Sequence, residues 1–410
     1  MRCGLLGEHL GHSFSPQIHR ELADYSYELF EVEPTDVEDF VKNGTLDAYN
    51  VTIPYKKTVM PFLDVISKEA EAIGSVNTVV RRDGKLYGYN TDYFGFDHML
   101  TSSGIDPKDK KAIVFGTGGA SVTVCAVLRD RGVRELCVIG IEDNTKENLA
   151  KHTDAQIIVN ATPVGMYPNN LVSPVDISMF PKLCGVLDVV YNPARTALLL
   201  AAEKRGIAYS GGLSMLVAQA VKAFEFFTGE NAEDGITDKI LQSVAAKTQN
   251  IILVGMPGCG KSTLGKLIAK RLGREFFDAD DVFTEMFGMT PANMITEQGE
   301  DEFRKHEGEA LRELGKKSGV VIACGGGAVT REFNYEPLHQ NGVIIFIERD
   351  LERLATGGRP LSQKTPVREL YAARIDKYHR FADIEIKSTE IPNKTVDAIL
   401  ASLVGYRYVR

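Results

Sequence analysis

The stretch Ile251-Ile252-Leu253-Val254-Gly255-Met256-Pro257-Gly258-Cys259-Gly260-Lys261-Ser262-Thr263 decides the fold of the second half of this chain. The four apolar residues predict a buried strand, and the GxxxxGK[ST] pattern after them predicts a phosphate-binding loop that leads into a helix. In such a loop backbone N–H groups wrap the phosphates, the lysine reaches the outer phosphates, and the next hydroxyl ligates Mg²⁺. We therefore expect a nucleoside-triphosphate site that uses Gly258, Gly260, Lys261, Ser262 and Thr263.

A second glycine-rich turn, Gly116-Thr117-Gly118-Gly119-Ala120, follows the apolar run Ile113-Val114-Phe115. Its shape is that of a dinucleotide-binding turn between a strand and a helix. The third glycine of the general fingerprint is missing, but the small Ser121 still permits close packing of helix on strand. The chain therefore carries two phosphate-binding turns of different kinds.

Length and composition describe a globular protein of several domains. The chain has 410 residues, of which 44% are hydrophobic and 25% charged, so two or three domains are expected. The net charge of −8 argues against nucleic acid or an anionic membrane as the main partner. There is no apolar run of about 20 residues and no secretion signal. The six cysteines are scattered and form no CxxC pair. We therefore expect free thiols in a reducing cytoplasm and no cysteine metal site.

Short apolar strand candidates alternate with longer helical patterns, which predicts parallel α/β layers. Five strand candidates in the second half begin near Ile251, Glu275, Val320, Val343 and Ile384. The polar stretch 228–235 reads as a seam, and the helical spacing of 236–244 allows that segment to pack on the first half. We place the boundary between the halves near Lys247.

Several polar residues of the first half have both a functional and a structural interpretation. Ser15 before Pro16 predicts a helix N-cap, and a helix start flanked by Ser13 and Ser15 is able to bind a carboxylate. The segment 50–56 predicts a strand running into a Pro-started helix, with Lys56 near the strand's end, where ligand sites gather. Taken singly, Ser15 and Asp92 are as well explained as caps, and Lys56 as a surface lysine.

Together, segments of the first half resemble the shikimate dehydrogenase family, in family order over residues 1–245. The matching segments are 12–16 (HSFSP), 50–56 (NVTIPYK), 77–78 (NT), 90–92 (NTD), 160–166 (NATPVGM), 188–193 (DVVYNP) and 212–220 (GLSMLVAQA). The resemblance implies a substrate-binding domain built from residues 1–95 and 206–246. It also implies a Rossmann-like nucleotide domain over residues 96–205.

The resemblance further implies reversible hydride transfer between a nicotinamide and 3-dehydroshikimate, with Lys56 and Asp92 as the catalytic pair. Physically, an ammonium stabilises the oxyanion formed from a ketone and is able to supply its proton, while a carboxylate keeps that ammonium charged. The family assigns substrate contacts to Ser13, Ser15, Thr52, Asn77, Tyr191 and Gln219. It assigns cofactor contacts to Gly116, Gly118, Gly119, Ala120, Thr162 and Gly212.

The adenosine side of the cofactor pocket departs from the family pattern. Relatives often carry Asn-Arg-Thr after the second strand, whose arginine clamps the 2′-phosphate of NADP, whereas this chain has Gly140-Ile141-Glu142. A carboxylate suits a free ribose 2′-hydroxyl better. The chain also passes from 146–151 almost directly into the strand at 156–159, which omits one strand–helix unit. The resemblance to the family favours NADP as the cofactor, and NAD is the alternative.

The second half resembles the shikimate kinase family over residues 250–410, on the phosphate loop and an ordered set of later motifs. These motifs are 277–280 (FDAD), 303–307 (FRKHE), 324–327 (CGGG), 359–361 (RPL), Arg374 and Tyr378. The resemblance implies a P-loop fold with a five-stranded parallel sheet, ATP and Mg²⁺. It implies catalytic roles for Lys261, Asp280 and Arg359, and Mg²⁺ contacts for Ser262 and Asp278. Substrate contacts are assigned to Arg304, Gly326, Gly327 and Arg374.

The products of the two halves line up, because the first reaction would yield the substrate of the second. We therefore expect a bifunctional cytoplasmic enzyme of aromatic amino-acid precursor synthesis that acts on small molecules, with the oligomeric state left open. In one alternative, the substrate of the first half is quinate, or quinate as well as shikimate, and its cofactor is NAD. Another makes it a metabolite sensor without turnover, fused to an active kinase.

Overall fold

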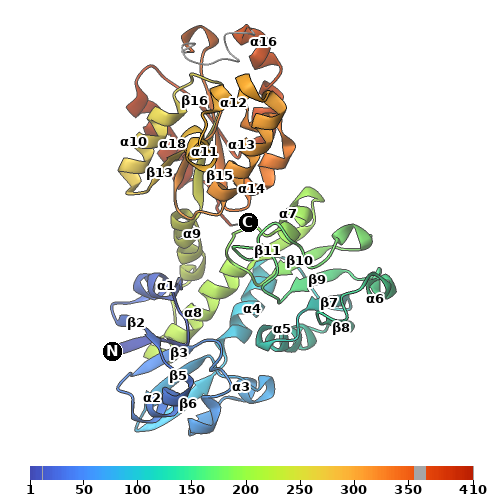
Figure 1. Cartoon of the computed structure of the whole chain (residues 1–410). Coiled ribbons are helices and arrows are strands. Elements are labelled where there is room, and N and C mark those ends of the chain that lie inside the picture. The colour runs from blue at the N-terminus through green and yellow to red at the C-terminus, as the bar shows by residue number, and fades with distance from the viewer. Residues whose placement is uncertain (12, 355–365, 410) are drawn as a thin grey trace. The chain divides into compact units, whose positions relative to one another are not determined.

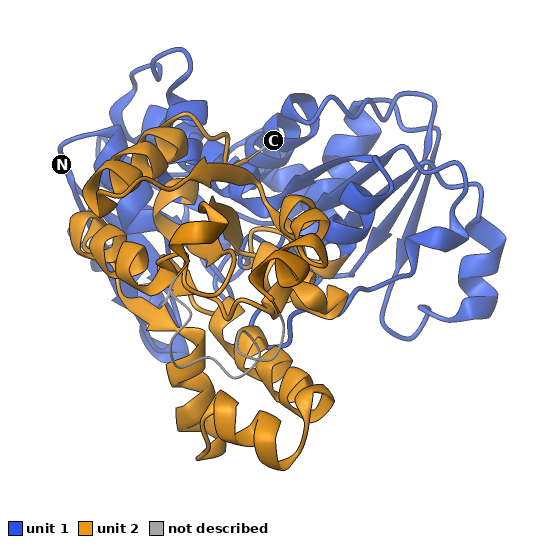
Figure 2. Ribbon diagram, turned by 90° about the horizontal axis from the view of Figure 1, so that it is seen from above, with its two compact units in different colours: residues 1–192, 198–244, 410 blue, residues 193–197, 245–409 orange. Residues whose placement is uncertain are grey.

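The computed structural model describes residues 1–11, 13–354 and 366–409. The chain divides into two compact units, coloured separately in Figure 2. Unit 1 comprises residues 1–192 and 198–244, and unit 2 comprises 193–197 and 245–409. A single residue, Gln249, lies between helix α9 (Ile236–Thr248) and strand β12 (Asn250–Val254), so the covalent connection between the halves is short.

The first sheet of unit 1 has six strands in the order β2-β1-β3-β5-β6-β4. β1 pairs in parallel with β2 and β3, whereas β5 runs antiparallel to β3 and β6. The strands are β1 (Arg2–Gly7), β2 (Ser26–Glu31), β3 (Ala48–Val51), β4 (Val65–Ile66), β5 (Thr78–Arg82) and β6 (Lys85–Tyr89). The short helices here are α1 (Ser15–Leu22), α2 (Val37–Asn43) and α3 (Lys68–Ile73).

The second sheet of unit 1 is wholly parallel, in the order β11-β10-β9-β7-β8. Its strands are β7 (Lys111–Phe115), β8 (Glu135–Ile139), β9 (Ile157–Asn160), β10 (Gly185–Asp188) and β11 (Ala208–Gly211). Only α6 (Lys146–Leu149) and a 3-10 turn lie between β8 and β9, so β8 forms an edge where a further strand–helix unit would pair. The predicted trimmed Rossmann-like sheet is confirmed.

Two helices join the sheets of unit 1. α4 (Thr91–Ser102) packs along α8 (Gly212–Thr228), and both helices also contact β11 (Figure 1). α5 (Gly119–Asp130) follows the first glycine turn and contacts α4, and α7 (Ala197–Lys204) precedes β11. β11 pairs with β10, so residues 208–211 belong to the nucleotide sheet, although the sequence division put them in the substrate domain.

Unit 2 is built on a five-stranded parallel sheet in the order β13-β14-β12-β15-β16. Besides β12, its strands are β13 (Phe276–Asp278), β14 (Val321–Ala323), β15 (Gly342–Glu348) and β16 (Ile384–Lys387). α10 (Lys261–Leu272) pairs with α18 (Pro392–Val404), while α13 (Glu300–Gly315) packs with α11 (Ala279–Phe287), α12 (Pro291–Glu297) and α14 (Tyr335–His339) (Figure 1). α16 (Val367–Ala372) and α17 (Ile375–Phe381) precede β16. The predicted P-loop sheet is confirmed.

Two local expectations for the first half are wrong. The N-cap of α1 is Phe14, and Ser15 is the first helical residue, because the Ser13 hydroxyl accepts the N–H of Ser15 and begins the turn one residue earlier. After β3 the chain forms a series of turns rather than a regular α-helix, although Val59 N still donates to the Tyr55 carbonyl.

Candidate active sites

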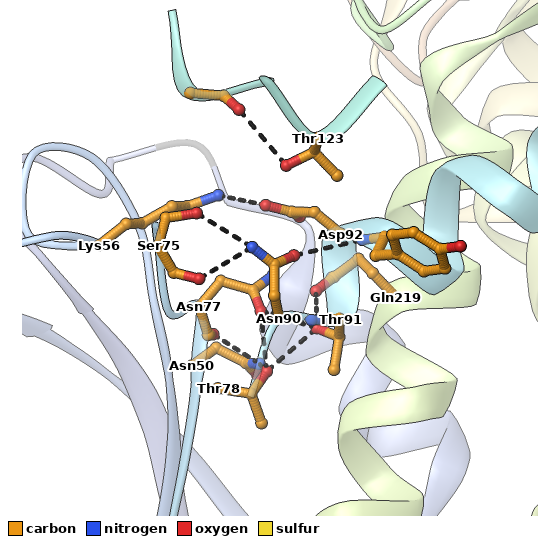
Figure 3. Close-up of polar contacts among 12 residues, drawn as sticks. Asn50, Lys56, Ser75, Asn77, Thr78, Asn90, Thr91, Asp92, Thr123 and Gln219 are labelled. Atoms are coloured by element: carbon orange, nitrogen blue, oxygen red, sulfur yellow. Dashed lines mark hydrogen bonds and ion pairs between the residues drawn. The ribbon is translucent and has the colours of Figure 1, made fainter. Parts of the chain in front are cut away.

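Lys56 and Asp92 form an ion pair in unit 1, with 2.6 Å between Nζ and Oδ2 (Figure 3). Lys56 lies in the turns after β3, and Asp92 lies in the first turn of α4. The side chains are 26% and 16% exposed, so a ligand and solvent still reach them. Two residues 36 positions apart are therefore brought together as a proton-donating pair beside an accessible surface.

A network of neutral side chains holds the start of α4, below this pair. The carboxamide oxygen of Asn77 accepts bonds from the Thr91 backbone N–H at 2.6 Å and from the Thr91 hydroxyl at 3.1 Å. The carboxamide oxygen of Gln219 of α8 lies 3.2 Å from the Thr91 hydroxyl and is a second acceptor for its one proton (Figure 3). All three residues are buried. Two predicted substrate residues, Asn77 and Gln219, thus belong to the scaffold that fixes Asp92.

Asn90 completes this scaffold on the opposite side of the helix start. Its side chain caps α4 by accepting the N–H of Tyr93, and its amide nitrogen donates to the carbonyl and hydroxyl of Ser75, both at 3.0 Å. A capping side chain fixed by two further bonds orients the first turn of the helix. The position of the Asp92 carboxylate is therefore determined by buried neutral groups from three separate chain segments.

The remaining predicted substrate residues of unit 1 occupy several elements. Ser15 is buried at the start of α1, and the partly buried Ser13 lies just before it. Thr52 follows β3 and packs its methyl group beside Gly7. The ring of Tyr191 lies 5.4 Å from that of Phe14, and burial raises the pKa of the Tyr191 hydroxyl. Tyr191 is thus a neutral hydrogen-bonding group near the start of α1.

The first glycine turn has room for a ligand along its outer side. A Cβ placed on Gly118 or Gly119 would meet no heavy atom within 4 Å, so these exposed residues leave the N-terminus of α5 open. Such a helix start favours the phosphates of a dinucleotide. Ala120 continues this helix, so the turn fits the predicted cofactor.

The other predicted cofactor residues are packed against protein. Gly116 has φ of +111°, and a Cβ there would lie 2.9 Å from the Ala161 carbonyl. A Cβ on Gly212 would lie 2.0 Å from the Val189 carbonyl. The Thr162 hydroxyl donates to Asn160 at 2.6 Å. These three residues set the close approach of β7, β9 and α8 around the turn.

In unit 2, the phosphate loop joins β12 to α10 and lines a cavity of about 590 Å³. The Lys261 ammonium folds back onto the loop, donating to the carbonyls of Gly255 at 2.8 Å and Met256 at 3.1 Å. The Ser262 hydroxyl donates to Asp278 at 2.6 Å, so the two predicted Mg²⁺ ligands lie side by side. Paired hard oxygen donors next to a phosphate loop are the ligands that Mg²⁺ prefers.

Asp280 lies beside this pair, at the start of α11. Asp278 accepts the backbone N–H of Asp280 at 3.1 Å. The Asp280 side chain is open to the solvent of the cavity but enclosed by protein on its other sides. Burial first, and then the Asp278 carboxylate, raise the pKa of Asp280 above its ordinary value. A carboxylate with a raised pKa is a better acceptor for a hydroxyl proton.

Two arginines face the same cavity and are fixed by protein groups. Arg304 of α13 forms ion pairs with Glu307 at 2.6 Å and Glu300 at 3.0 Å. A Cβ on Gly327 would lie 2.1 Å from the Arg304 guanidinium, so the glycine lets the arginine lie against the backbone. Arg374 donates to the Gly326 carbonyl at 3.1 Å. These glycines therefore position arginines, a structural role that the sequence interpretation did not give them.

Two further residues at this site received no role from the sequence, although Tyr378 is one of the family motifs. The Tyr378 hydroxyl donates to the Gly326 carbonyl at 2.5 Å, which fixes the glycine loop from below. Arg349, the residue directly after β15, lines the cavity beside the phosphate loop, close to Gly260. In the sequence, Arg349 is a basic residue directly after a predicted strand. This position indicates a phosphate contact only when β15 is known to lie beside β12. The predicted lid residue Arg359 lies outside the described residues.

Comparison with known proteins agrees with both sites. A family model for the shikimate dehydrogenase substrate binding domain matches residues 5–79, and a model for shikimate kinase matches residues 257–404. A shikimate dehydrogenase (NADP(+)) of Clostridium beijerinckii is 38% identical over 245 residues, which cover 55% of this chain and 90% of the relative. The chain belongs to the shikimate dehydrogenase family. Its second half adds a shikimate kinase domain, so the protein is an enzyme that joins two activities.

Solved structures of shikimate dehydrogenases match the first half. Shikimate dehydrogenase 1 of Peptoclostridium difficile is 37% identical, with a TM-score of 0.53, and the match covers 59% of this chain and 97% of that one. The enzyme of Listeria monocytogenes in complex with shikimate and NAD is 32% identical, with a TM-score of 0.54, over 59% and 96%. Within the described residues, no helix is long and apolar enough to cross a bilayer.

Proposed function

We propose that the first half reduces 3-dehydroshikimate to shikimate and that the second half phosphorylates the 3-hydroxyl of shikimate with ATP. The observation that carries the proposal is the accessible Lys56–Asp92 pair in a chain that also holds a phosphate-loop cavity lined by Arg304 and Arg374. Each half then serves one oxyacid, and the product of the first reaction is the substrate of the second.

In the reduction, a bound nicotinamide dinucleotide supplies the hydride. The Lys56 ammonium stabilises the negative charge that develops on the ketone oxygen and donates the proton that completes the alcohol. Asp92, held by the neutral network, orients the ammonium through their 2.6 Å ion pair. Ser13 and Ser15 bind the substrate carboxylate, and Thr52, Asn77, Tyr191 and Gln219 bind its carboxylate or hydroxyls. The open turn at Gly118, Gly119 and Ala120, with Gly116, Thr162 and Gly212 behind it, binds the cofactor.

In the phosphorylation, Arg304 and Arg374 bind the shikimate carboxylate, because guanidinium groups bind carboxylates through two parallel bonds. Asp280 accepts the proton of the 3-hydroxyl. Lys261 binds the outer phosphates over the backbone of Gly258, Gly260 and Thr263, and Ser262 and Asp278 hold Mg²⁺. Arg359 stabilises the negative charge of the transferring phosphoryl group. The short ion pair of Arg304 with Glu307 supports its role as a fixed anchor.

A second candidate for the first half is a quinate or shikimate dehydrogenase that uses NAD. One observation favours NAD: a Cβ on Gly140 would lie 3.5 Å from the Asp143 carboxylate and 3.3 Å from Thr117 of the glycine turn. A carboxylate at this place accepts the ribose 2′-hydroxyl and repels a 2′-phosphate. The relatives named as NADP enzymes favour the other cofactor, and the Listeria structure with shikimate and NAD shows that both occur among similar proteins.

A coupled assay with the purified full chain tests the proposal. We expect the enzyme to form shikimate from 3-dehydroshikimate with NADPH or NADH. Added ATP and Mg²⁺ should then convert shikimate to shikimate 3-phosphate, and mass spectrometry detects both products. Parallel rates with quinate and with each nicotinamide decide between the two dehydrogenase candidates. Tight binding of shikimate without turnover by the first half would instead indicate a sensor and contradict the proposal.

A further inference from the structure

The strand order of unit 2 brings the end of β15 against the phosphate loop. β12 and β15 pair in parallel, with Val254 opposite Phe346, so their carboxyl ends meet at one edge of the sheet. A Cβ on Gly255 would lie 2.6 Å from the Ile347 carbonyl, which shows how closely the loop follows β15. The residues directly beyond β15 therefore lie at the place where a nucleotide's phosphates bind.

Arg349 occupies this place. Its Nη1 would lie 3.6 Å from a Cβ on Gly260, the residue that precedes α10 at the end of the loop. The guanidinium lines the same cavity as Lys261 and Ser262. Gly260 adopts a φ of +99° and has no side chain, so the guanidinium lies close to the backbone of the loop.

Arg349 differs from the other cations of the cavity because its donors are uncommitted. Arg304 is paired with two glutamates, Arg374 donates to a carbonyl, and Lys261 donates to two carbonyls of the loop. Across the described residues, the Arg349 guanidinium has neither a hydrogen-bond partner nor an ion-pair partner. A partly buried guanidinium without an anion, facing a phosphate loop, fits a polyanion with several oxygens.

We propose that Arg349 binds the polyphosphate of the nucleotide, together with Lys261 of the phosphate loop. The inference deepens the proposed kinase function and rests on it. Phosphoryl transfer spreads negative charge over several phosphate oxygens, and fixed guanidinium donors stabilise that charge. Arg349 directly follows strand β15, so the sheet fixes its backbone beside the loop.

The test compares Arg349→Gln, Arg349→Lys and the matched control Arg353→Gln in the full chain. Arg353 lies four residues further along and is half exposed in an ion pair with Glu390 at 2.6 Å. Because one charge-assisted bond is lost, we expect Arg349→Gln to weaken ADP binding and raise the KM for ATP by about tenfold or more. Arg349→Lys should fall in between, and the control should match the wild type.

Calorimetry with adenosine separates a phosphate contact from a base contact. Adenosine should bind wild type and Arg349→Gln equally, and dehydrogenase rates should not change. ADP affinity of Arg349→Gln within twofold of wild type, or an equal loss for adenosine, would overturn the inference. If the wild type binds ADP but does not phosphorylate shikimate, the proposed kinase function fails, and the ADP comparison still decides the role of Arg349.

Discussion

The two candidate active sites of this chain are built from different kinds of side chain. In unit 1, one ion pair stands on a buried network of amides and hydroxyls contributed by Asn77, Asn90 and Thr91. In unit 2, the cavity is lined by charged groups of both signs, namely Lys261, Asp278, Asp280, Arg304, Glu307, Arg349 and Arg374. The difference fits the charge that each proposed reaction develops. A ketone reduction develops one negative charge, whereas phosphoryl transfer handles a polyanion throughout.

The largest expected effect is the separation of the two activities. Lys56→Ala removes the only ammonium described in contact with Asp92, and we expect dehydrogenase kcat/KM to fall by about 10²- to 10⁴-fold while the kinase rate is unchanged. Lys261→Ala should do the reverse. Both rates are measured on each variant, with the unfolding midpoint as a control. Loss of both activities in a folded variant would show that the sites are not independent.

The sequence predicted local patterns well and non-local neighbours poorly. The phosphate loop and the five strands of unit 2 are found where the apolar runs place them, because each pattern is short and continuous. Arg349 could not be recognised, since its meaning depends on β15 lying beside β12. The cap of α1 was misplaced by one residue because the Ser13 hydroxyl accepts the Ser15 N–H, so that Ser15 becomes the first helical residue and Phe14 the N-cap.

The second prediction concerns the neutral network itself. Asn77→Ala leaves the buried Thr91 N–H without its acceptor and removes one of the acceptors near the Thr91 hydroxyl, which should cost about 1–3 kcal/mol in the stability of unit 1. Because Asp92 follows Thr91 directly, we also expect dehydrogenase kcat/KM to fall by about tenfold or more. Asn43→Ala, which removes an exposed bond to Asp39, is the matched control. An Asn77 variant with the control's activity would show that the network does not position Asp92.

The third prediction concerns the stability of unit 1 at acid pH, which depends on a buried neutral histidine. His19 is fully buried, stacked on Tyr27 with ring centroids 3.9 Å apart and bonded to the Tyr25 hydroxyl at 2.6 Å. Burial lowers the pKa of His19 from 6.5 to about 3. Below pH 6.5 His19 therefore binds a proton in the unfolded chain but not in the folded chain, so the free energy of unfolding falls as the pH drops toward 3. For one such group the loss is about 2 kcal/mol by pH 5.

Hydrogen exchange of peptides from α1 and β2, corrected for intrinsic rates, measures this loss. His19→Phe keeps the stacked ring but cannot take up the proton, so its stability should change less between pH 7 and pH 5. His379→Gln, in an exposed pair with Glu385 of unit 2, is the control and should keep the wild-type slope. Equal slopes for His19→Phe and wild type would contradict the assignment.

The smallest effect tests whether the charged site responds to charges at its rim. Burial and Asp278 raise the pKa of Asp280, and the exposed Asp281 adds to this shift. Asp280 must be deprotonated to accept the hydroxyl proton, so kinase kcat/KM for shikimate should fall as the pH drops through this raised pKa. Asp281→Asn should move that acid limb to lower pH by about 0.1–0.7 unit, as expected for an exposed charge.

Asp301→Asn provides the matched control for this shift, because Asp301 is 91% exposed on α13 and is paired with Arg331. It should leave the acid limb unchanged, and neither variant should move the pH profile of the dehydrogenase. An acid limb that stayed in place in Asp281→Asn would mean that another group governs it. A limb that moved in the dehydrogenase profile as well would remove the contrast between a neutral scaffold and a charged cavity, because both sites would then respond to the same remote charge.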